Sequence, residues 1–197
     1  MDDVTGADQS VAHQSFADPG FADLPRLARR AVELYASERA VLAPPEVSAD
    51  SPLLQPAACF VSIKTDGGDL RGCIGTIEPA RPSLLEEVLA NAVSAATRDP
   101  RFPPVAAAEL PHLRFSVDVL SAPEPTRPQE LDPRTYGVIV TDEQNRRRGL
   151  LLPAIEGVET VEQQVDIAAR KAGLRPDEPL RFYRFRVQRF REQPDTN

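Results

Sequence analysis

Residues 57–76, "AACFVSIKTDGGDLRGCIGT", give the clearest secondary-structure signal in this chain. The run "AACFVSIKT" is rich in apolar and β-branched residues, which is typical of a strand. Gly67 and Gly68 suit a two-residue turn because glycine tolerates positive φ. The sequence therefore predicts a β-hairpin whose second strand contains "LRGCIG".

The turn fixes the expected register of this hairpin. With Gly67 and Gly68 at the tip, opposing residue numbers sum to 135, so we expect Ser62 to face Cys73 and Lys64 to face Arg71. Phe60 would face Gly75 on the same side, whereas the opposite side carries the apolar residues Val61, Ile63, Leu70 and Ile74. Cys59 falls on that apolar side, away from Cys73, so no disulfide is expected within the hairpin.

Cys73 is the candidate reactive group. Arg71 would lie on the same face, about 6.6 Å along the strand, and a cation at that range with Lys64 nearby favours the thiolate. Two facing cations repel unless an anion lies between them or the side chains splay into water, so a small anionic ligand is expected. Gly72 and Gly75 would leave space around the sulfur. The alternative is that Cys73 is a small buried hydrophobic residue and that the glycines only shape the hairpin.

Other motifs are weaker signals. The spacing Gly67-x4-Gly72 resembles the start of a phosphate loop, but Cys73 and Ile74 stand where lysine and serine or threonine are required. A cysteine nucleophile usually has a histidine base, and His112 is the only candidate outside the N-terminal stretch, where a surface position is the simpler interpretation.

The segment "TRDPRF" supplies Arg98, Asp99 and Arg101 directly after a predicted helix. These side chains would either cap the helix and form a local Asp–Arg pair, or bind an anion. Both interpretations stay open at the level of sequence.

The remaining pattern predicts helices from Leu24 to about Val41, after Ser83, and after Thr160. The second and third carry capping boxes, and Gly173 is expected just beyond the end of the third. Further strands are predicted around residues 115–119, 136–140, 149–152 and 180–190, and the last was expected to be an edge with one basic face. This order predicts an α+β fold of helices on mainly antiparallel sheets.

Composition limits the classes of function. The chain has 197 residues, is 41% hydrophobic and has a net charge of −7, which argues against nucleic acid as a partner. Two cysteines and two histidines are too few for a structural metal site, and no apolar run or signal sequence suggests a membrane or secretion, so a cytoplasmic location is expected. We expect a disordered acidic tail over 1–22, one domain over 23–191 and a short tail over 192–197.

Two motifs in combination resemble a known family. "LRGCIGTIEP" followed by "ANAVSAATRDPRFPPV", with "YGVIV", "RRGLLLP", "GVETVEQQVDIAARKAGL" and "FYRFRVQRF", resembles the AMMECR domain family, called protein A of the AmmeMemoRadiSam system. The resemblance implies a domain of two lobes with "LRGCIGT" near a cleft between them. It implies candidate site residues Arg71, Gly72, Cys73, Gly75 and Thr76, with Arg98, Asp99 and Arg101 from the second motif.

The resemblance supplies no established reaction and no known cofactor, and two functions remain in competition. In the first, an enzyme or substrate-handling protein uses Cys73 as a nucleophile or transient carrier, and Arg71 with Lys64 or Arg101 holds an anionic group. In the second, a non-catalytic module docks a Memo-like protein or a radical S-adenosylmethionine enzyme, the partners that the family's name implies.

Overall fold

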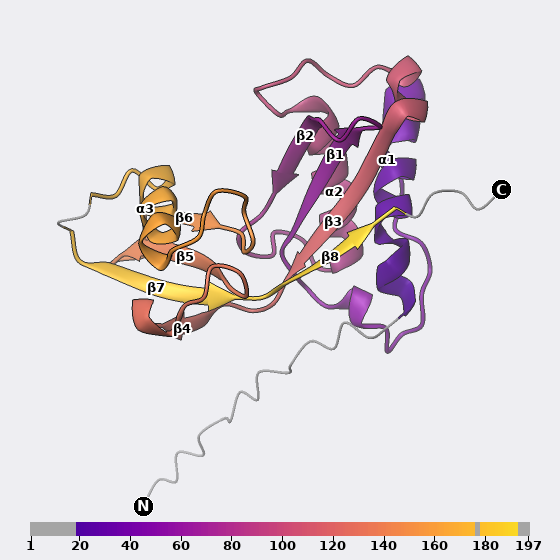
Figure 1. Cartoon of the computed structure of the whole chain (residues 1–197). Helices are drawn as coiled ribbons and strands as arrows, with labels where there is room; N and C mark the ends of the chain where they lie inside the picture. Colours follow the sequence, from indigo (N-terminus) through magenta and orange to yellow (C-terminus); the bar gives the residue numbers. More distant parts are fainter. Residues whose placement is uncertain (1–18, 176–177, 193–197) are drawn as a thin grey trace, which may run out of the picture.

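The computed structural model describes residues 19–175 and 178–192, and it contains two four-stranded antiparallel sheets (Figure 1). Sheet A has the order β2-β1-β3-β8 and sheet B the order β4-β7-β5-β6. The strands are β1 Cys59–Thr65, β2 Leu70–Gly75, β3 Leu113–Leu120, β4 Glu124–Thr126, β5 Gly137–Asp142, β6 Arg148–Leu151, β7 Leu180–Phe185 and β8 Val187–Arg191. The predicted α+β class is confirmed.

Three α-helices cover the sheets: α1 Leu24–Glu38, α2 Leu84–Thr97 and α3 Val161–Lys171. Helices α1 and α2 pack together on one face of sheet A, and α3 packs on β5 and β6 of sheet B. Short 3-10 helices lie at Pro19–Asp23, Pro52–Leu54, Ala107–His112 and Pro128–Glu130. Among the described residues, no helix combines the length and the apolar character needed to cross a membrane.

The helix ends follow the local sequence. The Oγ1 of Thr160 accepts the N–H of Gln163, and the Gln163 side chain accepts the N–H of Thr160, so this predicted capping box is confirmed. Ser83 is an N-cap, since its Oγ accepts the N–H of Glu86 at 3.2 Å, but the Glu86 carboxylate bonds to the Ser83 hydroxyl and does not complete the predicted box. Gly173 has a φ of 65°, as expected for a residue beyond a helix end. Helix α1 ends earlier than predicted, at Glu38, because Arg39 adopts a left-handed conformation with φ 57°.

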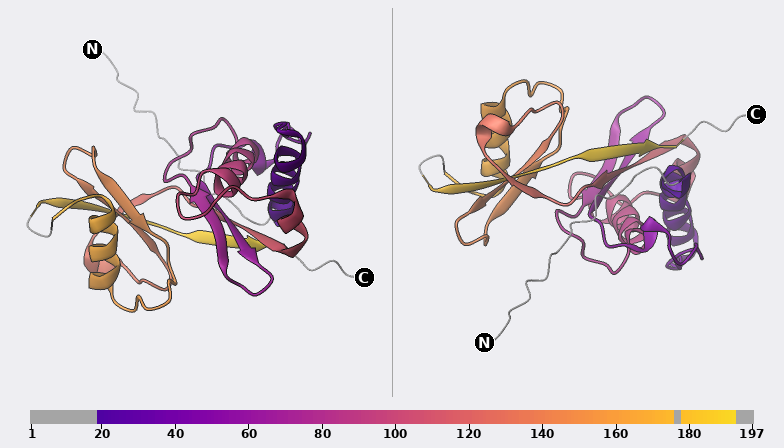
Figure 2. Two further views of the ribbon diagram at one scale, coloured as in Figure 1. Left: turned by 90° about the horizontal axis from the view of Figure 1, so that it is seen from above. Right: turned by 90° about the horizontal axis from the view of Figure 1, so that it is seen from below.

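The C-terminal stretch is two strands rather than the one that was predicted. Strand β7 lies between β4 and β5 in sheet B, whereas β8 is the edge strand of sheet A. Figure 2 shows this stretch running from one lobe into the other. At the crossing, Arg186 accepts the N–H of Ser121 at 2.9 Å and donates its own N–H to the Ser121 hydroxyl at 3.0 Å. The interpretation as an edge strand therefore holds for β8 alone.

The two lobes share an apolar cluster where this strand crosses. The lobe of sheet A contributes two buried members, Ala58 and Leu120, and sheet B contributes Ile139, Leu150 and Phe185. Phe60 and Tyr183 pack against them. This shared cluster fixes the position of one lobe against the other by excluding apolar surface from water.

The predicted tails are too long at both inner ends. Residues 19–22 belong to the 3-10 helix Pro19–Asp23, and the fully buried Phe21 stacks on Phe190 of β8 with ring centroids 5.6 Å apart. Glu192, assigned to the C-terminal tail, accepts a hydrogen bond from Arg29 of α1 at 2.8 Å. The contacts of Phe21 and Glu192 thus extend the domain by a few residues at each end. Residues 1–18 and 193–197 of the predicted tails lie outside the described part of the chain.

Candidate functional site

The β1–β2 hairpin has the predicted register beside Cys73 but not near its tip. Ser62 pairs with Cys73 as expected, yet the register shifts between Ile63 and Lys64, so that Lys64 pairs with Leu70 instead of Arg71. The cause is a three-residue turn closed by Thr65 and Asp69, whose N–H and carbonyl are 2.8 Å apart. One extra residue then remains on the second strand, and Arg71 occupies the bulge.

Arg71 therefore does not face Lys64, and the expected repulsion that called for an anion between them is absent. Its Nε and Nη2 donate to the two carboxylate oxygens of Glu109 at 2.8 and 3.0 Å, and its Nη1 donates to the carbonyl of Pro103 at 2.9 Å. The Arg71 guanidinium lowers the pKa of Glu109. In this arrangement Arg71 ties the loop after α2 to strand β2.

Cys73 lies on the edge strand β2 and is partly exposed. The hydroxyl of Ser62 donates to its Sγ at 3.2 Å, and its own backbone N–H donates to the Asp99 carboxylate at 2.8 Å. Cys59, by contrast, is fully buried on the opposite face of the sheet, as predicted. Burial raises the pKa of its thiol to about 12. Of the two thiols, only Cys73 is placed for chemistry.

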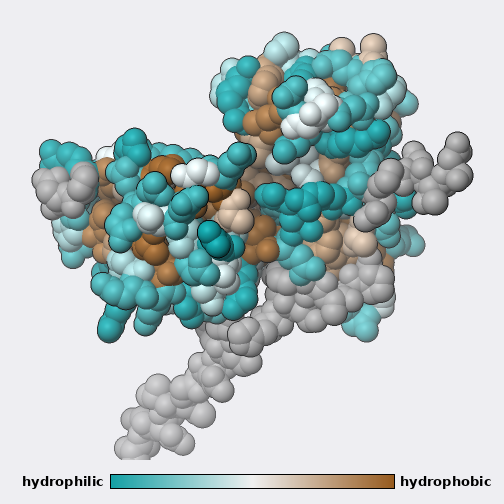
Figure 3. All heavy atoms as spheres, in the orientation of Figure 1, coloured by the Kyte–Doolittle hydropathy of each residue, from teal (hydrophilic) through white to brown (hydrophobic). Residues whose placement is uncertain are grey.

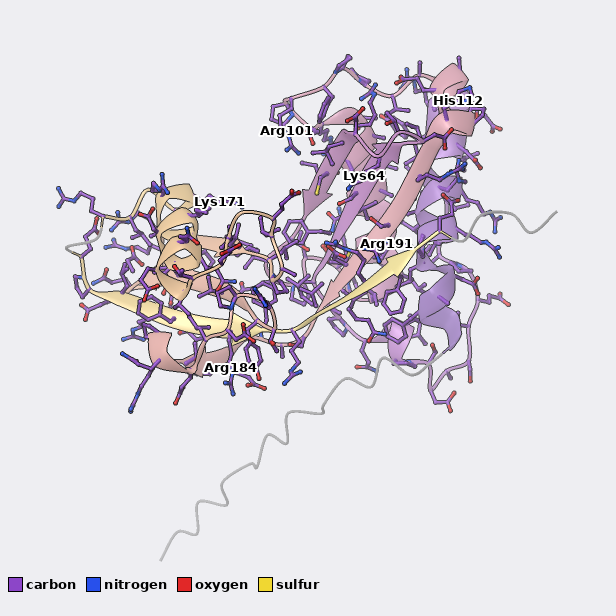
Figure 4. The ribbon with its side chains drawn as sticks, in the orientation of Figure 1. Lys64, Arg101, His112, Lys171, Arg184 and Arg191 are labelled. Carbon is purple, nitrogen blue, oxygen red and sulfur yellow. The ribbon has the colours of Figure 1, made fainter. Side chains whose placement is uncertain are left out.

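Asp99 joins the second motif to the first. Its buried carboxylate accepts two hydrogen bonds from the Arg101 guanidinium, at 2.9 and 2.7 Å, in addition to the N–H of Cys73. The Arg101 side chain holds the pKa of Asp99 well below its usual range. Hydrogen bonding to Asp99 raises the pKa of Arg101. The expected local Asp–Arg pair is present, and its carboxylate binds the backbone of Cys73; Figure 4 labels Arg101 at this edge of sheet A.

The two glycines beside Cys73 do not leave space around its sulfur, contrary to the prediction. A Cβ on Gly72 would lie 2.3 Å from the carbonyl oxygen of Ala95, so the space is filled by α2. A Cβ on Gly75 would lie 2.3 Å from the ring of Phe60. Both glycines permit close packing, which is a structural role.

Two other predicted site residues lie away from the sulfur. The Thr76 hydroxyl donates to the carboxylate of Glu87 at 2.7 Å, and Glu87 is buried. Arg98 is exposed and lines a groove of about 670 Å³ beside α2, with Leu89 and Val93.

His112, the candidate base, has the surface position that was the simpler interpretation and does not approach Cys73. The side chain of His112 is exposed and lies 3.5 Å from Asp66, beside the turn of the hairpin. Lys64 is exposed on β1, and its side chain forms no ion pair with any other residue in the described ranges. The structure thus brings together Cys73, Asp99 and Arg101, with Lys64 farther along the same sheet.

Sequence reasoning missed an ion pair near the sulfur. Arg189 of β8 donates to both carboxylate oxygens of Asp118 at 2.6 Å, and Asp118 is buried. This hydrogen bonding raises the pKa of Arg189. No local signal reveals the pair, because it depends on the pairing of β3 with the distant strand β8.

The surface around the site is hollowed between the lobes. Figure 3 shows a notch between them, and β2 is the strand of sheet A that borders it in the same orientation (Figure 1). The three described cavities, of about 670, 370 and 310 Å³, are not lined by Cys73. The partly exposed sulfur thus lies outside these three cavities.

The fold and site define a two-lobed α+β domain with a partly exposed thiol on an edge strand. The AMMECR1 family matches residues 25–192, and the chain belongs to this family. A Thermotoga maritima protein is 48% identical over 164 residues, covering 82% of this chain and 93% of that protein.

Two further relatives extend the comparison. The crystal structure of an uncharacterized protein from Pyrococcus horikoshii has a TM-score of 0.76 at 32% identity, and the match covers 88% of this chain and 92% of that one. A Clostridium acetobutylicum protein is 50% identical over 133 residues, which are 68% of this chain but only 28% of that protein. In that organism the domain is part of a longer polypeptide.

Proposed function

We propose that this AMMECR1-family protein uses the thiol of Cys73 as a nucleophile or transient carrier for a small anionic substrate. The observation that carries the proposal is the partly exposed sulfur, which accepts a hydrogen bond from Ser62 and lies beside the Asp99–Arg101 pair. A partly exposed sulfur can be reached by a substrate, and the half-exposed guanidinium of Arg101 can bind an anionic group next to it.

Arg101 is a better candidate for the anion-binding cation than Arg71. Its guanidinium is half exposed while it holds Asp99, so it retains surface for a ligand, whereas the Arg71 side chain is only 13% exposed and is used by Glu109 and Pro103. With no histidine near the sulfur among the described residues, the thiol proton would pass to water or to the substrate.

The competing function is a docking module for a Memo-like or radical S-adenosylmethionine partner. It is supported by the family resemblance and by the Clostridium relative, in which the same domain is joined to other polypeptide. The two functions differ in what they require of Cys73. A Cys73→Ser variant that binds such a partner normally but abolishes its pathway's flux would favour chemistry; a variant that keeps full flux would favour docking.

Selective alkylation tests the thiol directly. In the native protein at pH 8, iodoacetamide should modify Cys73 at least ~100-fold faster than Cys59, because Cys59 is inaccessible and its thiolate is suppressed. Peptide mass spectrometry at timed intervals distinguishes the two sites, and unfolding the protein in denaturant should make both react. Native labelling of Cys59 at the rate of Cys73, or no labelling of Cys73, would refute the proposal.

A further inference from the structure

A row of polar side chains crosses the whole of sheet A at the level of the sulfur. Cys73 on β2 pairs with Ser62 on β1, Ser62 pairs with Ser116 on β3, and Ser116 pairs with Arg191 on β8. Because directly paired residues share a face, a thiol, two hydroxyls and a guanidinium lie on the same side of the sheet.

This side is opposite to the helices. Phe190, the neighbour of Arg191 on β8, stacks on Phe21 with the core under α1 and α2, so Arg191 points the other way. All four members of the row are at least partly exposed. Figure 4 shows Lys64 and Arg191 on the face of sheet A that is turned toward the viewer.

The charge on this face is positive although the chain as a whole carries −7. Lys64 and Arg114 are paired residues on β1 and β3, and Arg191 lies opposite Ser116, two positions along β3 from Arg114. Asp66 is their single acidic partner, bonded to Arg114 at 2.9 Å. Within the described part of the chain, neither Lys64 nor Arg191 forms an ion pair, whereas Arg189 on the same face is paired with Asp118. Four cations and two carboxylates therefore leave an excess of two positive charges.

We propose that this face binds a phosphate monoester, with the phosphate held by Lys64, Arg191 and the Ser116 hydroxyl. A dianion matches the excess of two positive charges, and a lysine, an arginine and a hydroxyl are the donors that phosphate oxygens accept. The rest of the molecule lies along the row past Ser62. Since adjacent strands are about 4.8 Å apart, the ligand spans ~10 Å from Ser116 to Cys73.

This phosphate site rests on the proposed function of Cys73 in one point only, namely that the other end of the ligand lies at the Cys73 sulfur. Phosphate binding itself depends on Lys64 of β1, Ser116 of β3 and Arg191 of β8, and none of these residues lies on β2. A Cys73→Ser variant should therefore bind inorganic phosphate as the native chain does. Failure of phosphate binding and failure of thiol reactivity are separate results.

The sequence contains only two lysines, Lys64 and Lys171, which provides an internal control. Reductive methylation with ¹³C-formaldehyde keeps the charge of both and gives each a separate NMR signal. Titration with inorganic phosphate at constant ionic strength should shift the signal of Lys64 and leave that of Lys171 on α3 unchanged. Equal shifts of both signals, or no shift of Lys64, would overturn the proposal.

Variants identify the phosphate donors. Arg191→Ala should weaken the response of Lys64 to phosphate about tenfold, the effect of losing one hydrogen bond to a charged group. Arg184→Ala on strand β7 is the matched control and should leave the affinity unchanged. Acetate tests the ligand class: a response to acetate as strong as that to phosphate would contradict the assignment to a phosphate ester.

Discussion

Gly72→Ala should lower the free energy of unfolding by about 3 kcal/mol, the upper part of the range for overpacked sites. The added methyl group would lie 2.3 Å from the Ala95 carbonyl oxygen, and that atom belongs to the backbone of α2. A helix backbone cannot rotate aside as a side chain can, so α2 must move away from sheet A. Urea denaturation followed by circular dichroism gives the loss directly.

Gly67→Ala is the control within the same hairpin. The nearest atoms to its added methyl group are at 3.7 and 3.9 Å, an ordinary contact distance, so the change should stay within about 0.5 kcal/mol. If Gly72→Ala were as stable as Gly67→Ala, α2 could not pack against β2 as closely as described.

The sequence predicts well the features that depend on neighbouring residues. Serine and threonine caps at Ser83 and Thr160 form the expected hydrogen bonds, because cap and helix are only three residues apart. Alternation in β1 and β2 likewise places Cys59 and Cys73 on opposite faces, since strand periodicity is a local property. These features were enough to predict the α+β class.

Features that depend on one inserted residue or on distant pairing were not predictable in this way. A two-residue turn and a three-residue turn can be built from the same glycines. The observed three-residue turn moves Arg71 away from Lys64, and Arg71 then pairs with Glu109, which is distant in sequence. The division of residues 180–191 between two sheets is set by the lobes' shared apolar cluster, not by alternation. Arg189 could therefore not be assigned to the site from sequence alone.

The second large effect is expected at Asp99, the carboxylate that joins the two sequence motifs. Asp99→Asn should lower the free energy of unfolding by about 2–3 kcal/mol at pH 7, because bonds to a charged acceptor contribute ~1.5–3 kcal/mol each. The variant keeps the size of the side chain but replaces one of the two acceptor oxygens by an NH2 donor, so the bonds that both oxygens accept from Arg101 and from the Cys73 N–H cannot all be kept. Arg101 is half exposed and can be hydrated, so the loss stays below that of a fully buried pair.

This loss should depend on pH with a defined sign. In the folded protein Arg101 holds the pKa of Asp99 below the unfolded value of about 3.9, so its contribution is complete above that pH. It is lost as the pH falls toward the folded pKa, because the protonated carboxyl no longer attracts Arg101. The difference in stability between the native chain and Asp99→Asn should therefore be constant from pH 7 to 5 and shrink below about pH 4.

Asp69→Asn is the matched comparison, since Asp69 is an exposed aspartate in the hairpin turn. Its stability should differ from that of the native chain by no more than about 0.5 kcal/mol at pH 7. Thermal denaturation of the three proteins between pH 7 and 3 measures both dependences together. If the destabilisation by Asp99→Asn were independent of pH, packing rather than the charge of the carboxylate would hold Arg101 beside Cys73, and the electrostatic account of this site would fail.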